Sequence, residues 1–254
     1  MGSRTSKLLV GVNLKMYMDK AQTLSWLDAA VIGLGSFKSE EVELFLLPAT
    51  PLISQCLEKT SGSALAIGAQ NISAHDSGAF TGETSPQLLA QMGCKFALIG
   101  HHERRTLFSE SDEVISQKIA ASDRNNLIPI VCIGELSREE KSAQAEVKSQ
   151  IRSAVTEAKN LKKIVIAYEP TWAIGVDHPA TAEHINMMCS IIRQELEALN
   201  IANFQILYGG SAGEGLFEKI SGTCDGLFLG RRSHNPQTYL SIVQECISIK
   251  AANR

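Results

Sequence analysis

Short apolar runs recur along the whole chain, and this repetition restricts the possible folds more than any other feature. Most runs are rich in Val, Ile and Leu without polar alternation, which is typical of strands buried on both faces of a parallel sheet. The sequence predicts eight such strands, over residues 8–12, 42–47, 65–69, 96–99, 128–133, 164–168, 204–208 and 226–229.

Helical periodicity separates these strands. Residues 142–159 and 181–199 carry apolar side chains at helical spacing, and Ser85-Pro86 and Thr181-Ala182-Glu183 have the composition of helix starts. No long Pro-, Gly- or Ser-rich linker divides the pattern. The alternation therefore predicts one single-domain (β/α)8 TIM barrel over residues 1–254, with residues 1–7 as a short polar leader.

A doubly wound open sheet is the alternative architecture for such an alternation. Its dinucleotide-binding members carry a G-x-G-x-x-G turn after the first strand. Here the sequence at that point is Gly11-Val12-Asn13-Leu14-Lys15, so the first strand leads to a lysine instead of a glycine-rich cradle. The barrel is the favoured fold.

Charge composition argues against a polyanionic partner. The chain has 24 Lys and Arg against 27 Asp and Glu, a net charge of −3, which gives no general attraction to nucleic acid or anionic lipid. No apolar run approaches the roughly 18 residues that a spanning helix needs. We therefore expect no nucleic-acid and no membrane partner.

The cysteine pattern bears on compartment and metal binding. Six cysteines are widely scattered, no C-x-x-C occurs, and none pairs with histidine at zinc spacing. We interpret them as buried thiols in a reducing cytoplasm, and we expect no metal site and no cofactor.

Polar residues gather where the predicted strands end, which is the face on which barrels build their active sites. A single charge at a strand end is usually a solvated loop residue, but convergence from at least six strands indicates a catalytic site. The residues concerned are Asn13 and Lys15, His101 to Arg105, Glu135, Glu169, Gly209-Gly210-Ser211 and Gly230-Arg231.

Five of these segments, in order, carry a family resemblance. They are Asn13-Leu14-Lys15-Met16, residues 99–105 (IGHHERR), residues 132–135 (CIGE), residues 167–175 (AYEPTWAIG) and Tyr208-Gly209-Gly210-Ser211. Together they resemble the signature segments of the triosephosphate isomerase family, and the likeness extends over about residues 8–247. The resemblance implies an intramolecular oxidoreductase that isomerises small phosphorylated sugars through an enediolate.

The resemblance also assigns the expected chemistry. Glu169 is the expected base, which removes a proton beside the carbonyl and becomes more basic when it is desolvated. His101 is the expected electrophile, as a neutral imidazole at a helix start, and Lys15 adds a fixed positive charge. Asn13 is expected to orient Lys15 and a substrate oxygen.

Further residues are expected to bind the phosphate or support the site. The expected phosphate-binding residues, in the lid and in the seventh and eighth loops, are Gly175, Gly209, Gly210, Ser211, Gly230 and Arg231. Glu103 is expected to pair with Lys15 or Arg104, and Tyr208 and His102 to support the site from behind. Residues 170–180 form the predicted lid.

Three departures from the family pattern cluster around the ligand. Residues 174–180 lack the usual Thr-Gly-Lys of the lid and gain Pro179, Arg231 replaces a glycine of the eighth loop, and His102 replaces a serine. Two substrates remain open: a triose phosphate, or a four-carbon sugar phosphate such as L-erythrulose 1-phosphate, which a paralogous branch of the family isomerises. Arg231 and the lid favour the second.

Other classes of function fit less well. A catalytically silent phosphosugar-binding protein would be expected to have lost Lys15, His101 or Glu169, and a Schiff-base aldolase would need a lysine where Glu169 stands. Met16, the third-loop segment around Thr81, and Arg104 resemble residues that the family buries between subunits. A homodimer is therefore expected.

Overall fold

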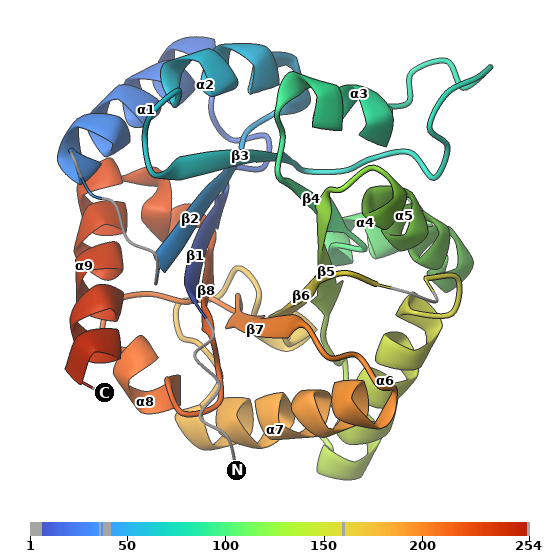
Figure 1. Cartoon of the computed structure of the whole chain (residues 1–254). Coiled ribbons are helices and arrows are strands. Elements are labelled where there is room, and N and C mark those ends of the chain that lie inside the picture. The colour runs from blue at the N-terminus through green and yellow to red at the C-terminus, as the bar shows by residue number, and fades with distance from the viewer. Residues whose placement is uncertain (1–6, 36, 38–41, 159–160, 253–254) are drawn as a thin grey trace.

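Eight parallel strands close into one barrel in their chain order, because β8 pairs back onto β1 (Figure 1). The computed structural model describes residues 7–35, 37, 42–158 and 161–252. The strands are β1 (Leu8–Asn13), β2 (Val42–Leu47), β3 (Leu65–Ala69), β4 (Phe96–Ile99), β5 (Ile128–Ile133), β6 (Ile164–Tyr168), β7 (Phe204–Tyr208) and β8 (Gly226–Leu229). The predicted barrel is confirmed, and only the first strand differs, being one residue longer.

Helices surround the barrel on its outside (Figure 1). They are α1 (Lys20–Leu34), α2 (Ile53–Lys59), α3 (Pro86–Met92), α4 (His102–Leu107), α5 (Asp112–Arg124), α6 (Glu140–Ala154), α7 (Ala182–Ala198), α8 (Phe217–Ile220) and α9 (Pro236–Ala252). Three short 3-10 turns are η1 (Thr50–Leu52), η2 (Thr171–Ala173) and η3 (Arg231–His234).

Helix α6 differs at both ends from the prediction over residues 142–159. It begins earlier because the Glu139 side chain accepts hydrogen bonds from the backbone of Lys141 and Ser142, which caps the first turn. It ends at Ala154, and the backbone N–H of Glu157 instead donates to Ser116 Oγ at 2.9 Å. The predicted end at Lys159 and the leader residues 1–6 lie outside the described residues.

The interior of the barrel is a packed apolar core. Phe45 occupies its middle, with ring centroids 4.7 Å from Phe96 and 5.9 Å from Phe228. A Cβ on Gly11 would lie 1.8 Å from the Phe45 ring, so the glycine of the first strand makes room for that ring. The packed interior leaves the ends of the barrel as the place where a binding site can form, as is general for this fold.

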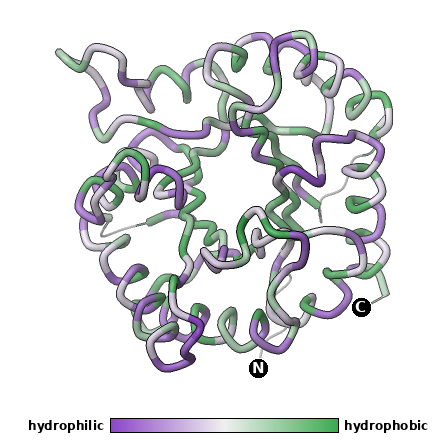
Figure 2. Tube along the Cα trace, turned by 180° about the vertical axis from the view of Figure 1, so that it is seen from behind, coloured by the Kyte–Doolittle hydropathy of each residue, from purple (hydrophilic) through white to green (hydrophobic). Residues whose placement is uncertain are grey.

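A second, larger apolar layer lies between the strands and the surrounding helices. Figure 2 shows hydrophobic residues along the ring of strands, whereas the outer helices alternate between hydrophobic and hydrophilic residues. In α7 the buried side chains include Ile185, Met188, Ile192 and Leu196, which recur at helical spacing on the inward face. This packing fixes the helices, and with them the loops that follow each strand.

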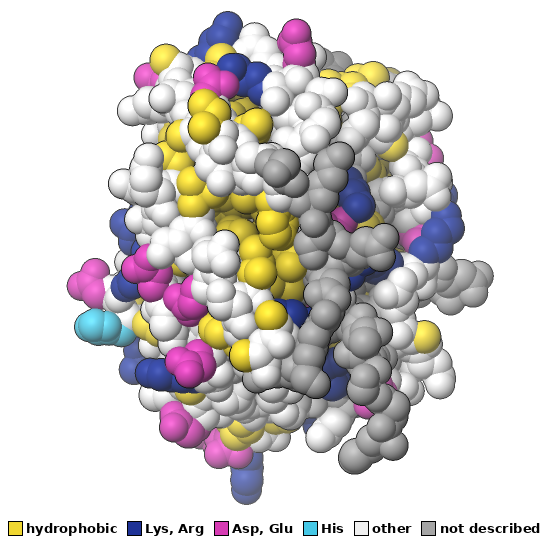
Figure 3. All heavy atoms as spheres, turned by 60° about the vertical axis from the view of Figure 1, so that its left-hand side comes forward, with side chains coloured by type: hydrophobic (Ala, Val, Ile, Leu, Met, Phe, Trp, Pro, Cys, Tyr) yellow, Lys and Arg dark blue, Asp and Glu magenta, His cyan; other side chains and the backbone are white. Residues whose placement is uncertain are grey.

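The outer surface carries charges of both signs. Figure 3 shows Lys and Arg side chains interspersed with Asp and Glu over one side of the molecule, with hydrophobic side chains visible between them. This mixture agrees with the small net charge of the chain. In the described part of the chain, no helix is long and apolar enough to span a membrane.

Candidate active site

An open cavity of about 460 Å³ lies where the strands end, between the loops that follow β1, β4, β6, β7 and β8. It brings together ten of the thirteen predicted site residues: Asn13, Lys15, His101, Glu103, Glu169, Gly175, Gly209, Ser211, Gly230 and Arg231. The other three surround it. Tyr208 is fully buried, a Cβ on Gly210 would lie 2.6 Å from the Tyr208 hydroxyl oxygen, and His102 lines a smaller adjoining pocket with Glu169.

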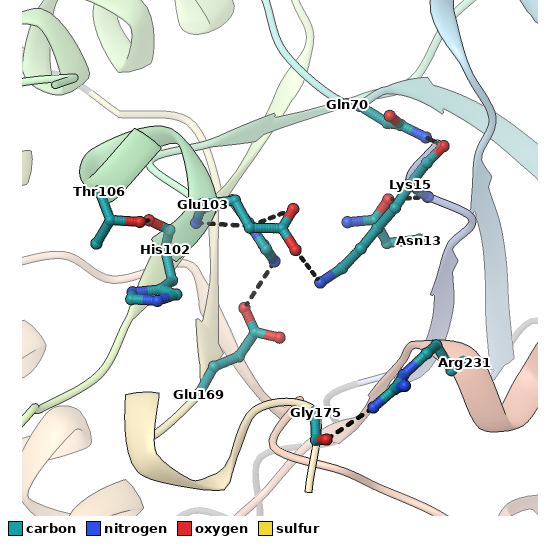
Figure 4. A network of polar contacts seen from close by, with 10 residues as sticks. Asn13, Lys15, Gln70, His102, Glu103, Thr106, Glu169, Gly175 and Arg231 are labelled. Atoms are coloured by element: carbon teal, nitrogen blue, oxygen red, sulfur yellow. Dashed lines mark hydrogen bonds and ion pairs between the residues drawn. The ribbon is translucent and has the colours of Figure 1, made fainter. Parts of the chain in front are cut away.

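Lys15 is held in an unusual backbone conformation. Its φ is +51°, a left-handed value that a non-glycine residue adopts only at a cost of order 1–3 kcal/mol. Two side chains hold this backbone: Asn13 Oδ1 accepts a hydrogen bond from Lys15 N–H at 2.9 Å, and Gln70 Nε2 donates to the Lys15 carbonyl at 2.9 Å (Figure 4). Asn13 thus orients Lys15 through the backbone. The contribution of Gln70 was not predicted from the sequence.

The Lys15 ammonium group is directed toward the fourth loop. Its Nζ lies 2.6 Å from Glu103 Oε1 (Figure 4). Arg104 pairs with Glu110 instead, at 2.8 Å. Partial burial opposes ionisation of Glu103, but the hydrogen bond from Lys15 and the neighbouring positive charges outweigh it and lower the pKa of Glu103. Of the two partners predicted for Glu103, Lys15 is therefore the one that the structure shows.

His101 is the residue immediately before α4 and caps that helix. Its Nδ1 accepts a hydrogen bond from the backbone N–H of Glu103 at 3.2 Å, which requires an unprotonated Nδ1. Burial lowers the pKa of His101 and outweighs the opposing effect of Glu169. The ring is therefore a neutral imidazole with its proton on Nε2, the nitrogen that lies 3.8 Å from Glu169 Oε2.

Glu169 follows directly from β6 and reaches into the cavity from that strand. Its side chain is only 9% exposed, and within the described part of the chain no group donates a hydrogen bond to its Oε2. A Cβ on Gly209 would lie 2.6 Å from Glu169 Cγ, so the glycine after β7 leaves room for this carboxylate. Figure 4 shows the carboxylate pointing away from His102. An unsolvated carboxylate oxygen facing a cavity is well placed to accept a proton.

A buried thiol adjoins the carboxylate. Cys132, the fifth residue of β5, lines the small pocket beside Glu169. Burial first, and then the nearby charge of Glu169, raise the pKa of the Cys132 thiol well above its usual range. The thiol stays neutral, so it packs against Glu169 without adding a competing negative charge.

The lid, residues 170–180, lies against the seventh and eighth loops. The Tyr208 hydroxyl accepts a hydrogen bond from the backbone N–H of Ala180 at 3.0 Å, which fastens the end of the lid. Ser211 Oγ lies 2.7 Å from the Val176 carbonyl oxygen, and an Arg231 guanidinium N–H donates to the Gly175 carbonyl at 2.7 Å (Figure 4). These contacts hold the lid against the seventh and eighth loops at one side of the cavity.

The start of the lid is anchored by a buried polar cluster around Glu135, a residue that was expected at the converging strand ends but not with these partners. Glu135 Oε1 lies 3.1 Å from the Tyr168 hydroxyl and 2.9 Å from His184 Nε2, and the His184 ring packs edge-on against Trp172. Glu135 is fully buried. A hydrogen-bonding residue on α7 directly beyond the lid could have suggested His184, but spacing alone does not pair it with Glu135.

Comparison with known proteins agrees with this geometry. The family model described as "Triosephosphate isomerase" matches residues 8–246. An L-erythrulose-1-phosphate isomerase of Pectobacterium atrosepticum is 39% identical, over 96% of this chain and 98% of that protein. A triosephosphate isomerase of Synechococcus sp. (strain JA-2-3B'a(2-13)) is 35% identical, over 93% of this chain and 96% of that protein. An L-erythrulose-1-phosphate isomerase of Brucella abortus is 33% identical, over 98% of this chain and 100% of that protein.

The barrel and the site at its carboxyl end, with these relatives, define a sugar-phosphate isomerase. The match covers nearly the whole chain. The chain belongs to the triosephosphate isomerase family.

The protonation state of His101 is directly measurable. Because its pKa is lowered in the folded protein, we expect ¹⁵N NMR to show a neutral ring with hydrogen on Nε2 at pH 7, and protonation only below the ordinary value of 6.5. The unfolded chain then binds the proton more readily, so this histidine makes the free energy of unfolding fall as pH drops below about 6.5. His101→Gln should flatten that slope. A charged His101 ring at pH 7 would contradict the assignment.

Proposed function

We propose that the chain interconverts two phosphorylated ketoses of four carbons, L-erythrulose 1-phosphate and D-erythrulose 4-phosphate, through an enediolate. The observation that carries the proposal is the facing pair at the cavity floor: Glu169 Oε2, which receives no hydrogen bond from the described residues, lies 3.8 Å from the Nε2 of a neutral His101. A base and a neutral donor at this separation can flank a carbonyl and its neighbouring carbon.

Each group has a distinct role in the proposed reaction. Glu169 removes the proton from the carbon beside the carbonyl and returns it to the carbonyl carbon. His101 donates a hydrogen bond from Nε2 to the enediolate oxygens, and Lys15 stabilises their negative charge. One preorganised donor of this kind typically contributes about 2.7–4 kcal/mol to transition-state stabilisation. Asn13 and Glu103 hold Lys15 in place through the contacts at 2.9 and 2.6 Å.

The phosphate is proposed to lie at the side of the cavity formed by the lid and the seventh and eighth loops. Backbone N–H groups of Gly175, Ser211 and Gly230 would bind it, with Gly209 and Gly210 permitting close approach. Arg231 adds a cation at this side, since its side chain lines the same cavity. Tyr208 and His102 are proposed to support the site without touching the substrate.

The substrate preference rests on two features. The eighth loop carries Arg231 in the cavity, and relatives at 39% and 33% identity bear the name L-erythrulose-1-phosphate isomerase. Triosephosphate isomerases at 35% identity support the second candidate, the interconversion of dihydroxyacetone phosphate and glyceraldehyde 3-phosphate. The four-carbon reaction would place the protein in erythritol breakdown, and the triose reaction in glycolysis and gluconeogenesis, both in the cytoplasm.

Kinetics with the two substrate classes decide between these candidates. We expect kcat/KM for L-erythrulose 1-phosphate to exceed that for dihydroxyacetone phosphate by at least about tenfold, because a difference of 1.4 kcal/mol in transition-state binding gives that ratio. A strong preference for the triose phosphate would contradict the four-carbon assignment and support the second candidate. Activity with neither substrate would contradict both.

We also propose that the protein is a homodimer. Met16 is 93% exposed although it is a large apolar residue, and Leu107 and Phe108 are exposed on the neighbouring fourth loop. The loop between β3 and α3, which contains Thr81, projects from the body of the molecule (Figure 1). Arg104 packs over the Phe108 ring at 4.9 Å. Such a surface is typical of one that a second subunit covers.

Light scattering tests the dimer. We expect a mass of about twice 27.5 kDa for the natural chain. Met16→Asp should reduce it to that of one chain, because a carboxylate would be buried unpaired. Ile32→Asp, which changes an exposed apolar residue of α1, is the matched control and should leave the mass unchanged. A monomeric natural chain would contradict the proposal.

A further inference from the structure

The contacts that hold the middle of the lid come from few donors. Ser211 Oγ lies 3.0 Å from the Ala173 carbonyl oxygen and 2.7 Å from that of Val176. A serine hydroxyl has one proton, so it can donate to only one of these two carbonyls at a time. The serine alone therefore cannot fix the segment between Gly175 and Asp177.

Two adjacent arginines reach the remaining carbonyls of that segment. An Nη2 group of Arg231 donates to the Gly175 carbonyl at 2.7 Å, and Arg232 Nη2 donates to the Asp177 carbonyl. These carbonyls flank Val176, the residue that Ser211 contacts. Three consecutive peptide groups of the lid are thus held by side chains of the seventh and eighth loops.

The two arginines project from a firmly held turn. Ser233 in η3 donates from its backbone N–H and from Oγ to the Gly230 carbonyl, at 3.0 and 2.7 Å. The indole N–H of Trp26 on α1 in turn donates to the Ser233 carbonyl at 2.8 Å. Both Ser233 and Trp26 are buried. The base from which the arginines extend is therefore part of the rigid core, while their guanidinium groups reach a surface loop.

The Arg232 side chain follows a defined course to the lid. A Cβ placed on Gly213 would lie 3.0 Å from Arg232 Nη1 and 3.1 Å from its Cδ, so the side chain passes close over the backbone of the seventh loop. Arg232 also lines the cavity, together with Asp177 and Gly175. Arginine suits this position, because its charge is permanent and its planar fork keeps its donors in a fixed geometry.

We propose that Arg232, acting with Arg231, is a positioning residue that latches the lid closed over the bound sugar phosphate. Arg232 acts through the Asp177 carbonyl, whereas Arg231 also faces the phosphate side of the cavity. The latch keeps the lid amides directed at the phosphate and thereby limits decay of the enediolate. This inference rests on the proposed isomerase function for its catalytic consequence, but the latch itself is a property of the folded chain.

The decay that the latch limits is an elimination. In an open site the enediolate oxygen re-forms a carbonyl, and the carbon–carbon double bond shifts toward the carbon that bears the phosphate. The bond from that carbon to oxygen breaks, and its electron pair leaves with the phosphate. The resulting enol tautomerises to a dicarbonyl compound, so the step needs no further reactant. Closure of a lid suppresses such side reactions.

Amide hydrogen exchange tests the latch without reference to activity. We expect Arg232→Ala to speed exchange at the Ile174 and Ala180 amides, whose N–H groups donate to the Thr171 carbonyl and the Tyr208 hydroxyl, by about tenfold. That is the effect of losing one charge-assisted hydrogen bond from the closed state. Arg232→Lys should give an intermediate rate. The matched control is Arg124→Ala, which breaks a surface pair between α5 and Asp76 and should leave the lid unchanged. Equal lid exchange in Arg232→Ala and the natural chain would overturn the latch.

Product partitioning tests the catalytic consequence. In Arg232→Ala the ratio of inorganic phosphate released to isomer formed should rise by about tenfold, since the same opening exposes the enediolate. A residue with a merely structural role would lower both products together. An unchanged ratio would overturn the proposed role in protecting the intermediate. If the natural chain isomerises neither substrate class, the proposed function fails, and hydrogen exchange still decides the latch.

Discussion

Closure of the parallel barrel is the constraint on which the rest of the molecule depends. Because all eight strands run in one direction, every strand end lies on the same face, and five distant segments of sequence line the cavity there. Phe45 fills the barrel interior, and Gly11 leaves it the space that it needs. The packed interior is rigid, so a strand cannot shift without disrupting its neighbours. The strand that precedes each loop therefore fixes the position of that loop.

At this face the candidate site keeps Lys15, His101 and Glu169 in states that water would not favour. Lys15 has a left-handed backbone supported by Asn13 and Gln70. His101 is neutral because it is buried and because its Nδ1 accepts a backbone hydrogen bond. Glu169 has almost no contact with solvent. Groups held in this way need little rearrangement during reaction, which is the physical basis of electrostatic preorganisation.

The sequence predicted the strands closely and the site in large part, for different reasons. Fully buried strands are continuous apolar runs, so the change to polar residues marks where each strand ends. The site was predicted because its segments carry a family resemblance. Gln70, His184 and the lid contact of Arg232 were not predicted. Each forms a hydrogen bond with a backbone group or a buried side chain that is distant in the sequence. No local sequence pattern specifies such a contact. Helix α6 ended early for a similar reason, through the contact of Glu157 with Ser116.

The central claim is that Glu169 moves a proton between neighbouring carbons through an enediolate. The most direct measurement is isomerisation in deuterium oxide followed by NMR of the product. We predict that deuterium enters at the carbon that receives the proton, and that Glu169→Gln slows this incorporation by about 10²- to 10⁴-fold while phosphate-analogue binding persists. Glu58→Gln, at an exposed position of α2, should change neither. Product free of solvent deuterium together with unchanged turnover in Glu169→Gln would contradict the account.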